Sequence, residues 1–219
     1  MNPDLCTVAW DHSPTRRAWL SHMAMNLLGL AGWLGGWVAL LGVSVYSADW
    51  VAWVFLPFFV YAPYRALVQC RYFPAALRML RIMRVYPWQV LHGAPHGLSD
   101  RPEVTSRHYG WFELPNPGRP EQCLPVVFTR HLRLEWWSRR MAPRAKPHLK
   151  SEIKEIWFAG DVRFAGVIAA PTPRGTAPRR LQIIEQRMES PDGQHLNEWG
   201  AGPHDLERGR RAGGQPAQF

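Results

Sequence analysis

The polar residues best placed to do chemistry are found in the segment EIKEIWFAGDVRFAGVIAAP. Two apolar, β-prone runs flank Gly160 and Asp161, and this pattern predicts a hairpin with a tight turn at these two residues. With a two-residue turn, Trp157 would face Phe164 across the two strands. Asp161 and Arg163 would then form a charge pair that the hairpin offers to a ligand or a partner protein. The simpler alternative is that Asp161 accepts a hydrogen bond from the backbone of its own turn.

Two histidines have a spacing that metal sites use. His92 and His96 are four residues apart, as helical metal ligands often are, but Gly93, Pro95 and Gly97 disfavour a helix here. No third ligand lies at a characteristic distance. We therefore expect no metal site and no cofactor.

Acid–base catalysis is not indicated by any local motif. The sequence has no nucleophile elbow, phosphate-binding glycine loop, HExxH pair or paired-carboxylate pattern. His131 beside Glu135 and His108 near Glu113 would permit acid–base pairs, but a chain with nine histidines offers many such pairs. We assign no catalytic residue, and an enzyme of unrecognised type is the least favoured alternative.

Two long apolar segments precede the polar part of the chain. Met23 to Tyr46 carries no charged residue and is long enough for a helix to cross a bilayer. A second apolar segment, Trp50 to Val68, begins after only three residues. Because backbone polar groups must be satisfied within hydrocarbon, residues 23–68 are predicted to form a transmembrane helical hairpin. A cleaved signal peptide is the alternative for the first segment, although its apolar core is usually only about 7–15 residues long.

The charge distribution predicts how this hairpin is oriented. The chain has a net charge of +9 and contains 26 Lys and Arg, of which Arg16 and Arg17 precede the first apolar segment. The others lie from Arg65 onward, and the connecting turn has only Asp49. By the positive-inside rule both termini face the cytoplasm, so residues 1–22 are expected to form a cytoplasmic tail at the plasma membrane.

Small residues in the first apolar segment suggest close helix packing. Gly32 and Gly36 form a small-xxx-small pair, which lets another helix approach closely. Packing against the second segment of the same chain is the simpler interpretation. Self-association, or packing on a helix of a larger membrane complex, is the alternative. No Asp, Glu, Lys or Arg lies in the interior of either segment, which disfavours a pump or channel built by this hairpin alone.

A basic amphipathic pattern follows the hairpin in residues 69–88. Arg78, Arg81 and Arg84 recur at every third position among apolar residues, and Arg71 precedes them. This pattern predicts a short helix on the cytoplasmic face of the membrane, whose arginines contact anionic lipid headgroups at about 1 kcal/mol each. Ordinary positive-inside anchoring without lipid selectivity is the simpler alternative.

Residues 101–187 are predicted to form a small β-rich cytoplasmic domain. Strands are expected within Thr105–Leu114, in the alternating run from Leu124 to Trp136, in the hairpin around Gly160, and in Leu181–Arg187. These short runs between turn residues favour an antiparallel sheet.

Two polar regions accompany this domain. Residues 138–150 are predicted to be an exposed basic loop that could contact phosphates. No recognition helix or base-stacking surface accompanies the loop, so a nucleic-acid partner is not expected. Residues 188–219 contain few apolar side chains to bury and are predicted to be disordered.

The order of these features along the chain resembles that of a known group of sequences. A short tail, a two-span hairpin, an Arg-rich stretch ending in Pro-Trp, and W-F-A-G-D-x-R-F-x-G-V at Trp157–Val167 resemble uncharacterised small integral membrane proteins of high-GC actinobacteria. The strong use of Arg over Lys is compatible with a high-GC genome. The resemblance covers roughly residues 16–171 and implies no activity and no catalytic residues.

These observations together predict an α+β membrane protein with a two-helix transmembrane hairpin and a small antiparallel β-rich cytoplasmic domain. We expect a membrane-tethered interaction or regulatory module without catalytic activity, and an accessory subunit of a larger membrane complex is the alternative. The expected partners are the lipid bilayer, a membrane or cytoplasmic protein, or a second copy of the chain.

Overall fold

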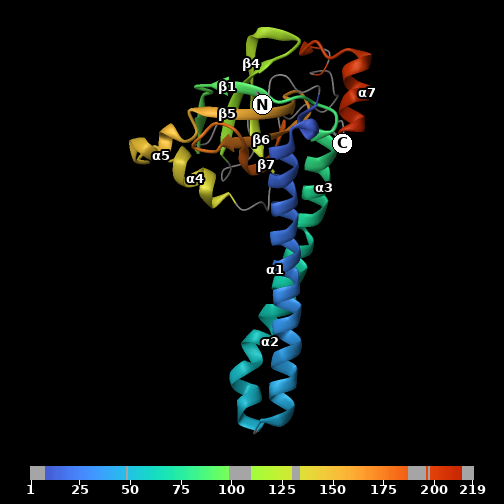
Figure 1. The fold of residues 1–219 in the computed structure, drawn as a ribbon, viewed down its shortest axis with the longest axis vertical. Coiled ribbons are helices and arrows are strands. Elements are labelled where there is room, and N and C mark those ends of the chain that lie inside the picture. Colours follow the sequence, from blue (N-terminus) through green and yellow to red (C-terminus); the bar gives the residue numbers. More distant parts are fainter. Residues whose placement is uncertain are drawn as a thin grey trace. The chain divides into compact units, whose positions relative to one another are not determined.

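The computed structural model describes residues 8–47, 49–98, 110–129, 134–186, 196 and 198–213. The chain divides into two compact units (Figure 1). One, here called the helical unit, is Leu20–Leu77, and the other, here called the sheet unit, comprises Met1–Trp19 and Arg78–Phe219.

Two long helices make up most of the helical unit. Helix α1 (Ser13–Tyr46) has 34 residues and α2 (Asp49–Cys70) has 22. Trp37 contacts Phe59, and Asn26 contacts Gln69, so α2 returns antiparallel along α1. Helix α3 (Tyr72–Met83) follows directly after α2.

Only part of the predicted transmembrane hairpin is supported by helix length and composition. Within the described ranges, α1 is the one helix long and apolar enough to cross a membrane. Helix α2, which was expected to be the second span, does not meet this criterion. Helix α2 contains Pro57, Pro63 and Arg65.

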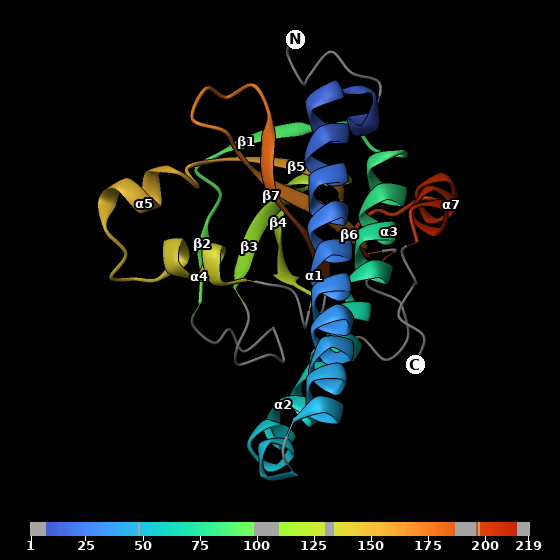
Figure 2. The ribbon, with the colours of Figure 1, turned by 60° about the horizontal axis from the view of Figure 1, so that its bottom comes forward.

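The sheet unit is built on one seven-stranded antiparallel sheet, as the sequence predicts (Figure 2). Its order is β1-β5-β6-β7-β4-β3-β2, so strand β7 links the β5–β6 hairpin to the β3–β4 hairpin. The strands are β1 (Gln89–His92), β2 (His96–Gly97), β3 (Trp111–Asn116), β4 (Arg119–Phe128), β5 (Glu155–Asp161), β6 (Ala165–Pro171) and β7 (Pro178–Gln186).

Strand β5 is buried on both of its faces. Phe158 belongs to the main core of the unit, whereas the ring of its neighbour Trp157 lies 5.9 Å from Trp88 and 5.7 Å from His12 on the opposite face. Successive strand residues point to opposite faces, so a strand covered on both sides needs apolar residues at every position. This explains the nearly continuous apolar runs in β5 and β6.

The main core is organised around Trp137 on the short helix α4 (Glu135–Met141). The Trp137 ring lies 5.9 Å from Phe112 and 5.7 Å from Phe128, and its indole nitrogen donates to the carbonyl oxygen of Arg180. The expected strand from Leu124 to Trp136 is therefore wrong at its end, where α4 has begun. Trp137 and Met141 are both buried at the i, i+4 spacing of a helix.

The sheet unit extends beyond the predicted domain at both ends. Ala9, in the 3-10 helix η2 (Ala9–Asp11), donates its backbone N–H to the Tyr86 carbonyl oxygen at 2.8 Å, so part of the predicted tail belongs to this unit. The prediction of disorder for residues 188–219 is wrong for the described part, because Pro203–Arg211 forms helix α7 and Trp199 is buried. The predicted strand Thr105–Leu114 is described only from residue 110, where β3 contains Trp111 and Leu114.

Candidate functional site

Gly160 does not form the predicted turn. In the β5–β6 pair Gly160 lies opposite Gly166 and Asp161 lies opposite Ala165, so the connecting loop is Val162–Phe164. Gly160 has φ +152°, and a Cβ atom there would lie 2.3 Å from the Gly166 Cα. Gly160 is thus required because the two backbones approach closely, and Gly166 is required because a Cβ atom there would lie 2.1 Å from the Phe158 ring.

Arg163 lies at the centre of a buried ion-pair cluster. Its Nε donates to Asp161 Oδ1 at 2.9 Å, and its Nη2 donates to Asp161 Oδ2 at 2.6 Å. Nη2 also lies 3.0 Å from Asp205 Oδ2, and Nη1 donates to the Gly200 carbonyl oxygen at 2.9 Å. Burial opposes the charged guanidinium, but the hydrogen bonds and charge of Asp161 outweigh it and raise the pKa of Arg163.

This cluster fastens the C-terminal segment to the sheet rather than facing solvent. The side chains of Arg163 and Asp161 are only 3% and 6% exposed, so the predicted partner surface at these residues is wrong. The simpler interpretation is confirmed, because the Arg163 backbone N–H donates to Asp161 Oδ1 at 3.0 Å. Asn116 adds a second attachment by donating to the Trp199 carbonyl oxygen.

The basic segment around α3 is partly built into the sheet unit. Arg78 forms an ion pair with Glu185 on β7. The Arg84 guanidinium lies 5.6 Å from the centre of the Trp10 ring. Arg78 is therefore not available as the predicted lipid contact, whereas the other three predicted contacts, Arg71, Arg81 and Arg84, are exposed.

The apolar face of α3 packs within the protein. Met79, Ile82 and Met83 are fully buried in the sheet unit. Ile82 lines a small space together with Phe164 and Gly209. The expectation that this face lies on the membrane surface is therefore wrong, because protein atoms cover it.

Helix packing in the helical unit uses a different glycine from those predicted. A Cβ atom at Gly32 or Gly36 would meet nothing within 4 Å, so these residues do not pack on α2. Gly29 instead makes room for Gln69, whose Nε2 would lie 3.1 Å from a Cβ there. Gln69 Nε2 donates to the backbone oxygen of Asn26 at 3.1 Å, and both side chains are buried.

The predicted basic loop 138–150 is largely ordered as helix. It contains the end of α4 and most of α5 (Pro147–Ser151). Arg140 stacks on Trp136 at 3.7 Å and pairs with Glu152, which Arg179 also contacts at 2.7 Å. Burial acts to raise the pKa of Glu152, but hydrogen bonds from Arg140 and Arg179 hold it below its usual value. These groups therefore stabilise the α4–α5 region against β7.

The two spaced histidines are held in separate interactions. His92 Nδ1 lies 4.0 Å from Glu155 Oε2 on the neighbouring strand, and His96 Nδ1 lies 2.9 Å from the Ala94 carbonyl oxygen. No group of three His, Cys, Asp or Glu residues suited to a metal ion occurs within the described ranges. His108 and His131 lie outside those ranges.

Two features of the structure were missed by sequence analysis. Trp37 Nε1 donates to the Phe59 carbonyl oxygen, and the signal for this contact was Pro63, four residues after Phe59. His12 is 1% exposed at the start of α1, and the pattern His-Ser-Pro-Thr gave a helix start but no reason to expect a buried histidine.

Comparison with known proteins adds no assignment. No family model, curated protein or solved structure matches this chain. The resemblance to actinobacterial membrane proteins therefore stays a prediction.

Proposed function

We propose that this chain is a membrane-tethered interaction module. In this proposal α1 and α2 insert into a bilayer as a hairpin, and the sheet unit lies on the cytoplasmic side, where it binds a partner protein. The resemblance and the positive charge on both sides of the hairpin support this orientation.

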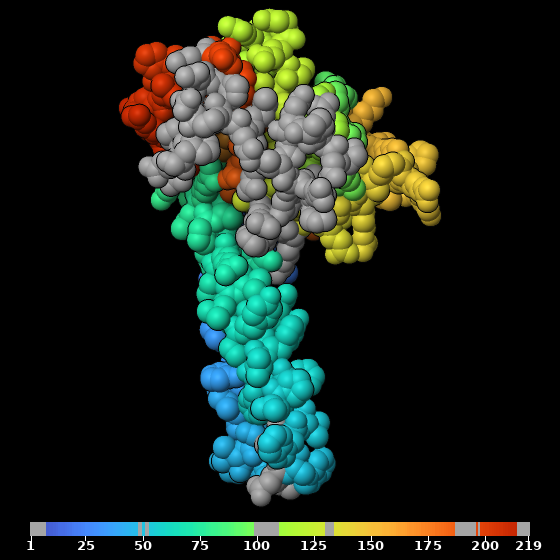
Figure 3. Space-filling view, turned by 180° about the vertical axis from the view of Figure 1, so that it is seen from behind, coloured from blue at the N-terminus to red at the C-terminus, as the bar shows by residue number. Residues whose placement is uncertain are grey.

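The observation that carries the proposal is where large apolar side chains are exposed. Among the described residues, all of them lie between Leu20 and Leu77. The colour bar of Figure 3 identifies this segment as the blue to green part of the space-filling view. Val45 is 77% exposed, Trp53 75% and Leu67 69%. Exposed apolar patches of this extent are rare in soluble monomers and are typical of membrane or protein contact surfaces. The sheet unit, by contrast, buries its large apolar side chains on both faces of the sheet.

Internal pairing of polar groups in the helical unit also supports insertion. Hydrocarbon offers no hydrogen bonds, so polar groups there must be satisfied within the protein. The Gln69–Asn26 and Trp37–Phe59 hydrogen bonds meet this need for the groups that they join, whereas Asn26 Nδ2 and Arg65 Nε have no hydrogen-bond partner among the described residues.

Fractionation of cell membranes tests the anchor. We expect the full chain to remain with membranes in high salt and at alkaline pH, and to require detergent for release. Release by salt alone would contradict insertion and favour a peripheral protein held by its basic residues.

Purification in gentle detergent, followed by mass spectrometry, tests the interaction. A reproducible stoichiometric partner that still binds when residues 20–77 are replaced by an unrelated two-span hairpin would support binding through the sheet unit. Recovery without a partner would contradict the interaction proposal.

An accessory subunit of a larger membrane complex is the second candidate. The observation that favours it is the open space beside Gly32 and Gly36, which leaves this face of α1 free for a partner helix. Replacing both glycines with Leu is then expected to abolish co-purification of the complex, and unchanged recovery would contradict this candidate.

A further inference from the structure

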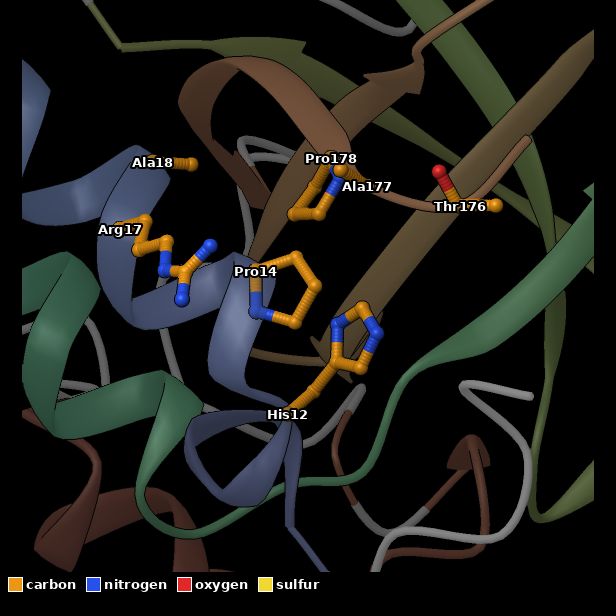
Figure 4. A pocket seen from close by; sticks show the side chains of 7 residues that line it. All are labelled: His12, Pro14, Arg17, Ala18, Thr176, Ala177 and Pro178. Atoms are coloured by element: carbon orange, nitrogen blue, oxygen red, sulfur yellow. The ribbon is translucent and has the colours of Figure 1, made fainter. Parts of the chain in front are cut away.

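A pocket of about 560 Å³ lies in the sheet unit between the start of α1 and the β6–β7 loop. Two prolines and two alanines form the apolar part of its wall, and a histidine, an arginine and a threonine form the polar part. The lining residues are His12, Pro14, Arg17, Ala18, Thr176, Ala177 and Pro178 (Figure 4). None of these seven residues is acidic, so the pocket has a positive but not a negative side chain.

His12 supplies a buried polar group whose bonding capacity is not used. Its imidazole points between Pro14 and Thr176 (Figure 4). Its Nδ1 lies 3.0 Å from the Thr15 hydroxyl, and its Nε2 has no hydrogen-bond partner within the described part of the chain. A buried nitrogen without a partner destabilises the folded state, and a ligand that bonds to it would offset this cost.

The neighbouring contacts determine which nitrogen of His12 carries the proton. Trp88 Nε1 donates to the Thr15 hydroxyl at 2.9 Å, so the Thr15 proton is free to bond to His12 Nδ1. Burial lowers the pKa of His12, which keeps the ring neutral at pH 7. A neutral ring that accepts at Nδ1 carries its proton on Nε2, so His12 holds a buried N–H donor that has no partner among the described residues.

Positive charge comes from two sources at the same pocket. Arg17 is exposed there and has no ion-pair or hydrogen-bond partner among the described residues. The pocket also lies at the N-terminus of the 34-residue helix α1, where the helix dipole favours an anion.

We propose that this pocket binds a phosphate group, with Arg17 as its charge partner and His12 Nε2–H as its buried donor. Guanidinium and N–H donors, with no carboxylate among the seven lining residues, match a phosphate better than a cation or a neutral ligand. The phosphate could belong to an anionic lipid headgroup or to a soluble phosphate compound. The proposal does not depend on the interaction function proposed above.

Thermal unfolding of the full chain in detergent tests this site, since a ligand that binds the folded state raises the unfolding temperature. The probes are inorganic phosphate against chloride at equal ionic strength, and dihexanoyl phosphatidic acid against dihexanoyl phosphatidylcholine. Stabilisation by inorganic phosphate indicates a soluble source. Stabilisation by phosphatidic acid alone indicates a headgroup.

Arg17→Gln is the test variant and Arg16→Gln is its matched control, because Arg16 is also exposed on α1 but does not line the pocket. We expect Arg17→Gln to weaken binding about tenfold or more, and Arg16→Gln to leave it unchanged. His12→Asn keeps an acceptor for Thr15 but lacks the Nε2 donor, so it should also weaken binding. No stabilisation by either probe, or equal stabilisation in the two arginine variants, would overturn the proposal, even if His12→Asn fails to fold.

Discussion

Trp37 donates its indole N–H to the carbonyl oxygen of Phe59 at 3.2 Å. In an uninterrupted helix this carbonyl would accept from the backbone N–H of residue 63, but residue 63 is proline and has no N–H. The side chain of α1 therefore replaces a hydrogen bond that α2 lacks. Such replacement matters most in hydrocarbon, where water cannot satisfy the carbonyl.

A double-mutant cycle tests this replacement. Trp37→Phe removes the donor and is expected to destabilise the helical unit by about 1 kcal/mol. In a Pro63→Ala background the same substitution should cost less, because alanine restores the N–H that bonds to Phe59. The measurement is unfolding in detergent followed by helical circular dichroism. An equal cost in both backgrounds would contradict the role assigned to Trp37.

The contact between Arg163 and Asp205 predicts how the C-terminal helix is held. Asp205→Ala removes one carboxylate of the buried cluster and the cap that Asp205 provides for the Gly202 N–H. We expect a loss of about 1–2 kcal/mol in local stability and faster proteolysis within α7. Glu207→Ala, which removes only an exposed pair with Arg211, is the control. Equal cleavage of the two variants would show that the cluster does not hold α7.

Arg180 has φ +56°, a backbone conformation that is unfavourable for a residue with a side chain. Arg180→Gly and Arg180→Ala both remove the guanidinium, but only glycine relieves the backbone. We expect the glycine variant to be more stable than the alanine variant by about 1 kcal/mol, measured by denaturant unfolding. Greater stability of the alanine variant would argue against strain at this position.

His12 predicts a pH dependence of stability. Its folded-state pKa lies below 6.5 because of burial, so below pH 6.5 the unfolded chain binds a proton that the folded chain does not. Stability should therefore be full above pH 6.5 and fall as the pH drops from there through the folded-state pKa. His12→Gln should flatten this part of the profile, measured by thermal unfolding between pH 5 and 8. An unchanged slope in the variant would show that His12 is not the group responsible.

Sequence periodicity predicted the antiparallel sheet but not the β5–β6 turn. Because β5 and β6 are covered on both faces, their apolar residues are nearly continuous and do not indicate register. Gly160 and Asp161 were therefore predicted to form the turn, because glycine and aspartate are common turn residues. In the structure Gly160 serves the close approach to Gly166, a contact between backbones that composition does not encode.

The C-terminal helix could not be predicted because its attachment is not apolar. Helix α7 has few apolar residues, and it is held by Arg163, which lies 42 positions before Asp205 in the sequence. Periodicity and composition report local preferences only. Long-range ion pairs of this kind appear only when the fold brings the two residues together.

The central claim is that α1 and α2 cross the bilayer as a hairpin, and cysteine accessibility tests it most directly. With Cys6, Cys70 and Cys123 replaced by serine, single cysteines would be introduced at Ser47, between the helices, and at Ser151, exposed on the sheet unit. We predict that a membrane-impermeant maleimide labels the Ser47 position in intact spheroplasts, and the Ser151 position only after permeabilisation. Labelling of both positions in intact spheroplasts, or of neither, would place them on the same side of the membrane and contradict the hairpin.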